Sequence, residues 1–186
     1  MMFFSTLVPI SADGISRSVS RSVLQSPVVA LVLSRLDYGN ATLAGIPDCL
    51  CDRLQSVMNA AARLIFSARK YDHVTTLLEE LHWLRAHQRI TYKLAMLSYR
   101  CLHGLAPSYL ARVADIKSRR HLRSAATERL ETPPVRRPTI GGRAFPAAAA
   151  DAWNGLLASP VTSAPSLETF RRSLKTELFS RSFPHL

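Results

Sequence analysis

Basic side chains recur at helical spacing between residues 85 and 103, and the chemistry they offer is the binding of phosphate groups. At about 100° of rotation per residue, four of them share one helix face: Arg85, Arg89, Lys93 and Arg100. Such a face can grip successive phosphates of a nucleic acid. The long aliphatic stems can instead cover apolar surface while their charged heads stay in water, so the spacing alone leaves both interpretations open.

The sequence contains no recognisable catalytic arrangement. A Gly-rich phosphate loop, an H-E-x-x-H motif and a G-x-S-x-G motif are all absent. Adjacent aspartates are absent too, although two-metal phosphoryl transfer needs clustered carboxylates that hold ions about 3.5–4 Å apart. Asp37 is a single acid, which we expect to pair with Arg35 or to cap a turn. We therefore predict no enzyme activity, no metal site and no cofactor.

The three cysteines, Cys49, Cys51 and Cys101, are too few and too unevenly spaced for a secreted disulfide framework. A zinc site usually shows tighter paired spacings, so we interpret them as buried or half-buried thiols. This usage indicates a reducing compartment, and we expect an intracellular chain, in the nucleus or the cytoplasm.

The chain of 186 residues carries a net charge of +11, which attracts phosphate polymers or anionic surfaces. The excess is densest in residues 117–143, where eight Lys and Arg face two Glu. Six arginines of this segment are candidates for phosphate contacts: Arg119, Arg120, Arg123, Arg136, Arg137 and Arg143. Three prolines interrupt any helix there, so we predict an extended basic connector that can form a short strand pair around residues 130–135. A solvated linker that contacts nothing is the alternative.

Apolar residues make up 47% of the chain and recur at helical spacing, which predicts an all-α fold. The longest predicted helix spans about residues 85–103, with its apolar stripe at Ile90, Leu94, Leu97 and Cys101. Gly104 follows it, where a left-handed cap costs little.

Four segments follow from these patterns. Residues 1–22 form a loose tail, and residues 23–116 form a small helical bundle. Residues 117–143 form the basic connector, and residues 144–186 form a C-terminal helical extension that can pack back onto the bundle. In this extension we expect an Ala-rich helix that ends near Gly155 and a last helix capped by Ser166.

The apolar run at residues 27–33 is too short to span a membrane, which takes about 20 residues. Basic helices also suit a membrane surface, but their apolar faces look needed for one another. We therefore expect no membrane partner.

Five blocks of the chain resemble the C-terminal part of the reverse transcriptase polyprotein of non-LTR retrotransposons, in the chicken-repeat and jockey-like branches. The resemblance covers roughly residues 23–183. The blocks are LVLSRLDYGNATLAG, LQSVMNAAARLIFSARKYDHVTTLLEELHWL, RITYKLAMLSYRCLHGLAPSYL, RLETPPVRRPTIGGRAFPAAAADAWNGL and SLETFRRSLKTELF. Two positions depart from the family pattern, which often has Pro where Arg85 stands and Pro near the place of Asp151.

The resemblance implies the non-catalytic end of an RNA-directed DNA polymerase: a helical thumb and C-terminal extension that hold template and primer, as RNA or DNA. The paired aspartates of the family's palm and its endonuclease are absent here, so a palm would be a partner, in cis or in trans. A thumb without its palm is expected to expose an apolar patch along residues 28–36, through which the chain can self-associate. The alternative is a degenerate retrotransposon-derived interaction or structural domain with no retained nucleic-acid activity.

Overall fold

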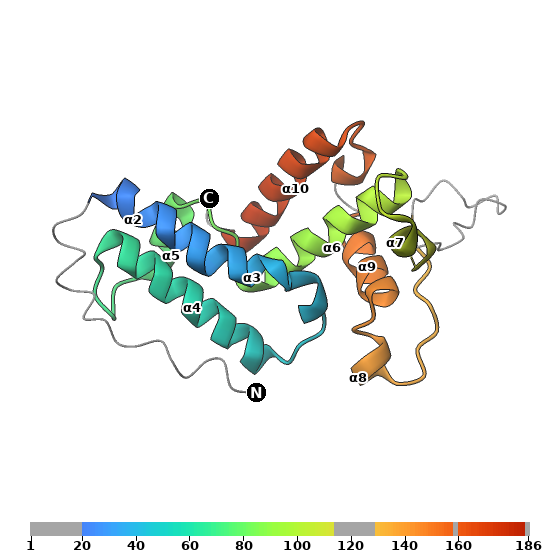
Figure 1. Ribbon diagram of the computed structural model, residues 1–186, viewed down its shortest axis with the longest axis horizontal. Coiled ribbons are helices and arrows are strands. Elements are labelled where there is room, and N and C mark those ends of the chain that lie inside the picture. Colours follow the sequence, from blue (N-terminus) through green and yellow to red (C-terminus); the bar gives the residue numbers. More distant parts are fainter. Residues whose placement is uncertain (1–19, 114–128, 158–159, 185–186) are drawn as a thin grey trace.

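The computed structural model describes residues 20–113, 129–157 and 160–184, and every regular element in these ranges is a helix (Figure 1). The predicted all-α fold class is therefore confirmed. Two groups of helices lie against one central helix, α6, and each group has its own apolar core. None of the helices in these ranges combines the length and the hydrophobicity that crossing a bilayer requires.

The N-terminal group begins with one continuous helical run. Its parts are α2 (Arg21–Val28), the π-helical turn η1 (Val29–Leu33) and α3 (Ser34–Tyr38). Pro27 supplies no N–H, and its ring crowds the carbonyl one turn earlier. The change of helical pitch just after Pro27 therefore has a steric cause.

The start of α2 lies two residues before the predicted bundle boundary at residue 23. Arg21, its first residue, forms an ion pair with Glu80, with 2.8 Å between Nη1 and Oε1. The Arg21 guanidinium also lies over the Phe66 ring, 3.6 Å from its centroid. These contacts tie the first turn of α2 to α4 and α5.

The rest of the N-terminal group consists of the 3-10 turn η2 (Asn40–Leu43), α4 (Asp48–Phe66) and α5 (Val74–Glu80). α4 begins directly after Pro47 and has Asp48 in its first turn, where a negative charge is favourable. It ends at Ser67, which adopts the left-handed conformation with φ of 51°. We call the apolar cluster of this group the N-terminal core; it contains Val28, Leu33, Met58, Ala61, Ala62, Ile65, Leu78, Leu81, Trp83, Ala86 and Phe183.

α6 (Ala86–Leu102) lies between the two groups, in contact with α4, η2, α9 and α10 (Figure 1). Its predicted limits are confirmed to within a residue, and Gly104 follows it with φ of +67°. The predicted apolar stripe is confirmed at Ile90 and Leu94, whereas Leu97 and Cys101 are only half-buried. Ala95, Ser98 and Tyr99 are buried instead. Buried and half-buried positions together cover most of the circumference of the helix.

The C-terminal group packs back onto α6. Its helices are α7 (Ser108–Val113), α8 (Pro138–Gly141), α9 (Phe145–Asn154), the 3-10 turn η3 (Pro160–Ser163) and α10 (Leu167–Ser182). α9 buries four consecutive alanines and Trp153, and α10 buries Phe170, Leu174 and Leu178. The predicted cap of α10 is confirmed, because the Ser166 hydroxyl accepts a hydrogen bond from the Thr169 N–H at 3.2 Å.

Aromatic rings connect this group to α6. Tyr99 of α6 stacks on Phe170 of α10 with 4.3 Å between ring centroids, and Phe170 stacks on Trp153 of α9 at 5.9 Å. The Tyr99 hydroxyl, buried with its ring, donates to the Ala164 carbonyl at 3.0 Å. We call the surrounding apolar cluster the C-terminal core; it contains Leu84, Ala95, Tyr99, Leu130, Ala150, Trp153, Leu156, Val161, Ala164, Phe170, Leu174 and Leu178.

The predicted strand pair around residues 130–135 is wrong: residues 129–135 are irregular. The backbone N–H and carbonyl of Leu130 instead pair with the side-chain amide of Asn154, each at 2.9 Å. Pro133 and Pro134 have no N–H to donate, so a ladder could not continue past Thr132.

Close approach of α9 to α6 makes a testable prediction. Ala150 is fully buried in the C-terminal core, and we expect Ala150→Leu to lower the free energy of unfolding by about 1–3 kcal/mol. The cause is that the added atoms must displace one helix from the other. Urea denaturation followed by circular dichroism measures this change.

Ala60→Leu is the matched control, because Ala60 lies on the exposed face of α4. We expect it to change the free energy of unfolding by less than about 0.5 kcal/mol. Equal effects of the two substitutions would contradict the close approach of α6 and α9.

Candidate nucleic-acid interface

The structure separates the four basic residues predicted to share a face of α6. Arg85, Lys93 and Arg100 have exposed side chains. Arg89 differs, because only 15% of its side chain is exposed and its guanidinium is engaged by the carboxylate of Asp37. The candidate interface on α6 is therefore a narrow ridge formed by Arg85, Lys93 and Arg100. Arg89 does not contribute to this ridge, because its guanidinium pairs with Asp37.

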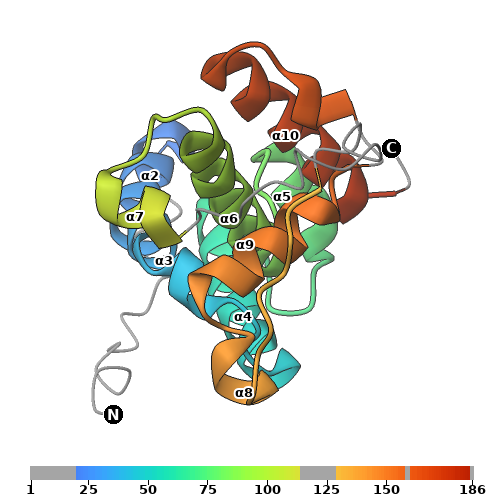
Figure 2. The same cartoon turned by 90° about the vertical axis from the view of Figure 1, so that its right-hand side faces the viewer.

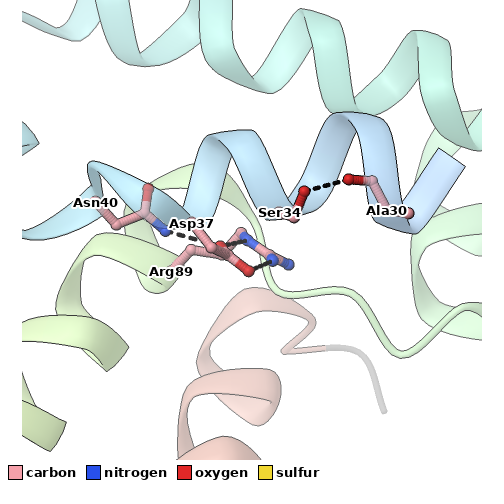
Figure 3. Close-up of polar contacts among 5 residues, drawn as sticks. All are labelled: Ala30, Ser34, Asp37, Asn40 and Arg89. Atoms are coloured by element: carbon pink, nitrogen blue, oxygen red, sulfur yellow. Dashed lines mark hydrogen bonds and ion pairs between the residues drawn. The ribbon is translucent and has the colours of Figure 1, made fainter.

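The ion pair of Arg89 and Asp37 joins α6 to the end of α3 (Figure 3). Arg89 Nε donates to Asp37 Oδ1 at 2.9 Å, and Arg89 Nη2 donates to Oδ2, so the contact is bidentate. The amide of the buried Asn40 donates to the same Oδ1 at 2.9 Å. The predicted pairing of Asp37 with Arg35 is wrong, since its carboxylate faces α6.

This geometry occupies the Arg89 guanidinium with a carboxylate of the chain itself. Contact of Arg89 with phosphate stays a prediction, and such contact would have to break a bidentate pair that is only partly exposed. Figure 3 also shows Ser34, whose hydroxyl donates to the Ala30 carbonyl one turn earlier in the same helical run.

The three exposed cations of α6 have few partners. Arg85 precedes the first turn of the helix and lies over the Phe183 ring, with 5.2 Å between its Cζ and the ring centroid. Lys93 and Arg100 form no ion pair with any described residue. They are seven residues apart, two helical turns, so their backbones lie about 10 Å apart along α6.

The connector arginines fall into two sets. Arg119, Arg120 and Arg123 lie outside the described residues. The other three precede or follow α8: Arg136, Arg137 and Arg143. Figures 1 and 2 both place α8 at the lower end of the molecule, below α6, so the structure does not bring these arginines onto the ridge of α6.

Arg143 holds the connector to the N-terminal group. Its Nε donates to the Gly45 carbonyl at 3.0 Å, in the turn that precedes α4. Gly45 has φ of +63°, and a Cβ at this position would lie 3.3 Å from the Arg143 side chain. Arg136 and Arg137 are exposed and form no ion pair within the described ranges.

Sequence reasoning missed an apolar hollow of about 490 Å³ beside Arg136 and Arg137. It lies between the segment 133–137, α8 and the first turn of α9. The signal in the sequence was the pair Pro133 and Pro134 a few residues before Ile140, which the connector interpretation treated only as helix interruption.

The prediction that all three cysteines are buried or half-buried is wrong for Cys49, which is exposed, whereas Cys51 and Cys101 are half-buried. Cys51 and Cys101 offer little nucleophilic chemistry. Burial, and then the nearby carboxylates of Asp52 and Asp48, raise the pKa of the Cys51 thiol. Burial also raises the pKa of Cys101, against the opposing charge of Arg100. Both groups are therefore protonated at neutral pH. Across the described ranges, no three His, Cys, Asp or Glu side chains gather closely enough to hold a metal ion.

No protein-family model, curated protein or solved structure matches this chain. The functional assignment therefore rests on the sequence blocks and on the placement of the exposed cations.

The ion pair between Asp37 and Arg89 makes a second prediction. We expect a double-mutant cycle of Asp37→Ala and Arg89→Ala to give a coupling free energy of about 1 kcal/mol, because the pair is bidentate but partly screened by solvent. Urea denaturation of the four proteins measures it.

Lys93→Ala removes a cation of the same helix that has no carboxylate partner, and it serves as the control. Combined with Asp37→Ala, it is expected to give no coupling. Additive effects of the Asp37 and Arg89 substitutions would mean that the pair contributes nothing to stability.

Proposed function

We propose that this chain is the thumb and C-terminal part of a non-LTR retrotransposon reverse transcriptase, and that it binds template–primer nucleic acid without catalysing a reaction. The contacts come from the exposed cations on α6, Arg85, Lys93 and Arg100, and from the connector arginines. The five sequence blocks that resemble this family support the assignment, and the sparse cysteine usage supports an intracellular location, in the nucleus or the cytoplasm.

The observation that supports this proposal is the exposure of Lys93 and Arg100, without a carboxylate partner among the described residues, on the helix that organises the fold. Because the backbone of both residues is already ordered in the helix, only side-chain rotamer freedom is lost when they meet phosphate. Each phosphate contact releases condensed counterions, which favours binding at low salt.

The lack of clustered aspartates in the sequence supports a binding role in place of catalysis. In this proposal a palm, in cis or in trans, supplies the polymerase chemistry. The chain then contributes a surface that holds the duplex next to that palm.

A degenerate structural domain without nucleic-acid activity is the second candidate. Two of the predicted site residues favour it, because Arg89 and Arg143 bind groups of the chain itself. Basic residues used for internal contacts keep a fold together whether or not any polyanion is present.

A binding experiment separates the two candidates. We expect the chain to bind a fluorescent RNA–DNA hybrid in an anisotropy titration, and Lys93→Glu with Arg100→Glu to weaken that binding at least about tenfold. The slope of log affinity against log salt should also decrease by about 2, since two phosphate contacts are lost.

The control reverses two exposed cations on α10, Arg172→Glu and Lys175→Glu, which makes the same change in net charge. We expect it to retain most of the affinity. Equal losses in both variants, or no binding of the hybrid by the native chain, would favour the second candidate.

The expected apolar patch along residues 28–36 is only partly exposed. Val28 and Leu33 are buried in the N-terminal core, whereas the Leu31 side chain is 67% exposed. Pro27 and Val23 are exposed about one and two turns before Leu31, respectively, and extend an apolar line along the helical run. We propose that this line is the surface that a palm would cover and that permits self-association in its absence.

Leu31→Glu is therefore expected to shift the chain toward monomer in sedimentation-velocity experiments at micromolar concentration. Leu105→Glu, which alters an exposed leucine after α6, is the control and should leave the distribution unchanged. A native chain that is monomeric throughout would contradict self-association through this line.

A further inference from the structure

The hollow beside α8 is built by close packing. It is lined by Pro133, Pro134, Val135, Arg136, Arg137, Ile140, Gly141, Ala144, Pro146 and Ala147. A Cβ on Gly141 would lie 2.1 Å from Val135 Cγ1, closer than any packed carbon pair can approach. Only glycine therefore allows α8 to lie this close to the segment 133–137. The hollow therefore results from specific packing of α8 against the segment 133–137, and it is not merely a gap between loops.

The side chains that line the hollow indicate which kind of group it can bind. Apart from the two arginines, the described side chains of the lining are aliphatic or proline rings, and Ile140 is 70% exposed. Among these described side chains there is no aromatic ring on which a nucleobase could stack. They also include no amide, hydroxyl or carboxylate group to read a base edge. An apolar side chain suits the hollow better than a nucleobase does.

The positive charge at the edge of the hollow indicates which groups should flank an apolar side chain bound there. Arg136 and Arg137 are exposed and have no carboxylate partner among the residues that the structure describes. The first turn of α9, which adds Pro146 and Ala147 to the lining, presents the positive end of a ten-residue helix. An occupant that carries carboxylates beside an apolar group complements both features.

We propose that this hollow docks an acidic segment of a partner protein, which inserts one large apolar side chain between Pro133–Pro134 and α9. Carboxylates on either side of that side chain pair with Arg136 and Arg137. The volume of about 490 Å³ lies within the range of small binding pockets, so one anchoring side chain and its neighbours account for it. The proposal uses none of the cations on α6, but it shares Arg136 and Arg137 with the proposed nucleic-acid contacts, so an acidic segment and a phosphate would compete for these two arginines.

The test uses a fluorescein-labelled peptide with the sequence Glu-Glu-Asp-Leu-Phe-Asp-Glu-Glu and the full chain, followed by fluorescence anisotropy. We expect saturable binding that weakens at least about tenfold in the Arg136→Glu, Arg137→Glu double variant. Ala144→Leu, at an exposed position in the lining, fills the hollow and should weaken binding by a similar factor. Ile140→Asp provides a second variant of the lining if Ala144→Leu fails to fold by circular dichroism.

The matched controls make the same kinds of substitution at positions away from the hollow. Arg172→Glu with Lys175→Glu reverses two exposed cations on α10, and Ala60→Leu adds a side chain to the exposed face of α4. Both should bind the peptide as the native chain does. Lys93→Glu with Arg100→Glu should also leave peptide binding unchanged, which distinguishes this proposal from the template–primer surface.

Two outcomes would overturn the proposal. The first outcome is that a peptide with Ser-Gly in place of Leu-Phe binds as tightly as the original peptide. The contact would then rest on charge attraction alone. The second outcome is that a single-stranded RNA displaces the peptide and that Ala144→Leu also weakens binding of this RNA. The hollow would then be a nucleic-acid site.

Discussion

The burial of α6 on most of its circumference is the constraint on which the rest of the structure depends. α4 and η2 cover it from one group of helices, and α9 and α10 cover it from the other. Small residues such as Ala95 and Ala150 are fully buried in the C-terminal core, because larger side chains would separate helices that must lie close. A helix enclosed in this way cannot also offer a broad charged face. Only a narrow exposed ridge remains for its cations.

The strongly basic composition therefore divides into cations that hold the fold and cations that face solvent. Arg89 and Arg143 belong to the first set, since each reaches a partner distant in the sequence. Lys93, Arg136 and Arg137 belong to the second, with no carboxylate partner in the described ranges. Net charge overstates the charge that is free to meet a polyanion, because a guanidinium in a bidentate pair is already neutralised. The two exposed sets also differ in surroundings: the ridge of α6 is a helix surface, whereas Arg136 and Arg137 border an apolar hollow.

The sequence could predict those features that depend on near neighbours. Apolar spacing located α6, and the conformational freedom of Gly104 and the hydroxyl of Ser166 located helix ends. It could not predict the pairing of Asp37 with Arg89, because 52 residues separate them and Arg35 offered a nearer cation. The hollow was missed for a different reason: Val135 and Gly141 are only six residues apart, but their contact depends on the backbone path between them, which the spacing of apolar residues does not define. The strand pair failed because Asn154 supplies the hydrogen bonds that a neighbouring strand would have supplied to Leu130.

Phe183 is almost the last residue that the structure describes, yet it is buried in the N-terminal core, among side chains of α2, α4 and α5. Its ring also contacts Phe179 and lies under the Arg85 guanidinium. During synthesis, the helices that emerge first therefore lack part of their packing until nearly the whole of this sequence has left the ribosome. Before that point, the nascent chain exposes an apolar surface that a chaperone can bind, and closure of the first core coincides with arrival of the last helix.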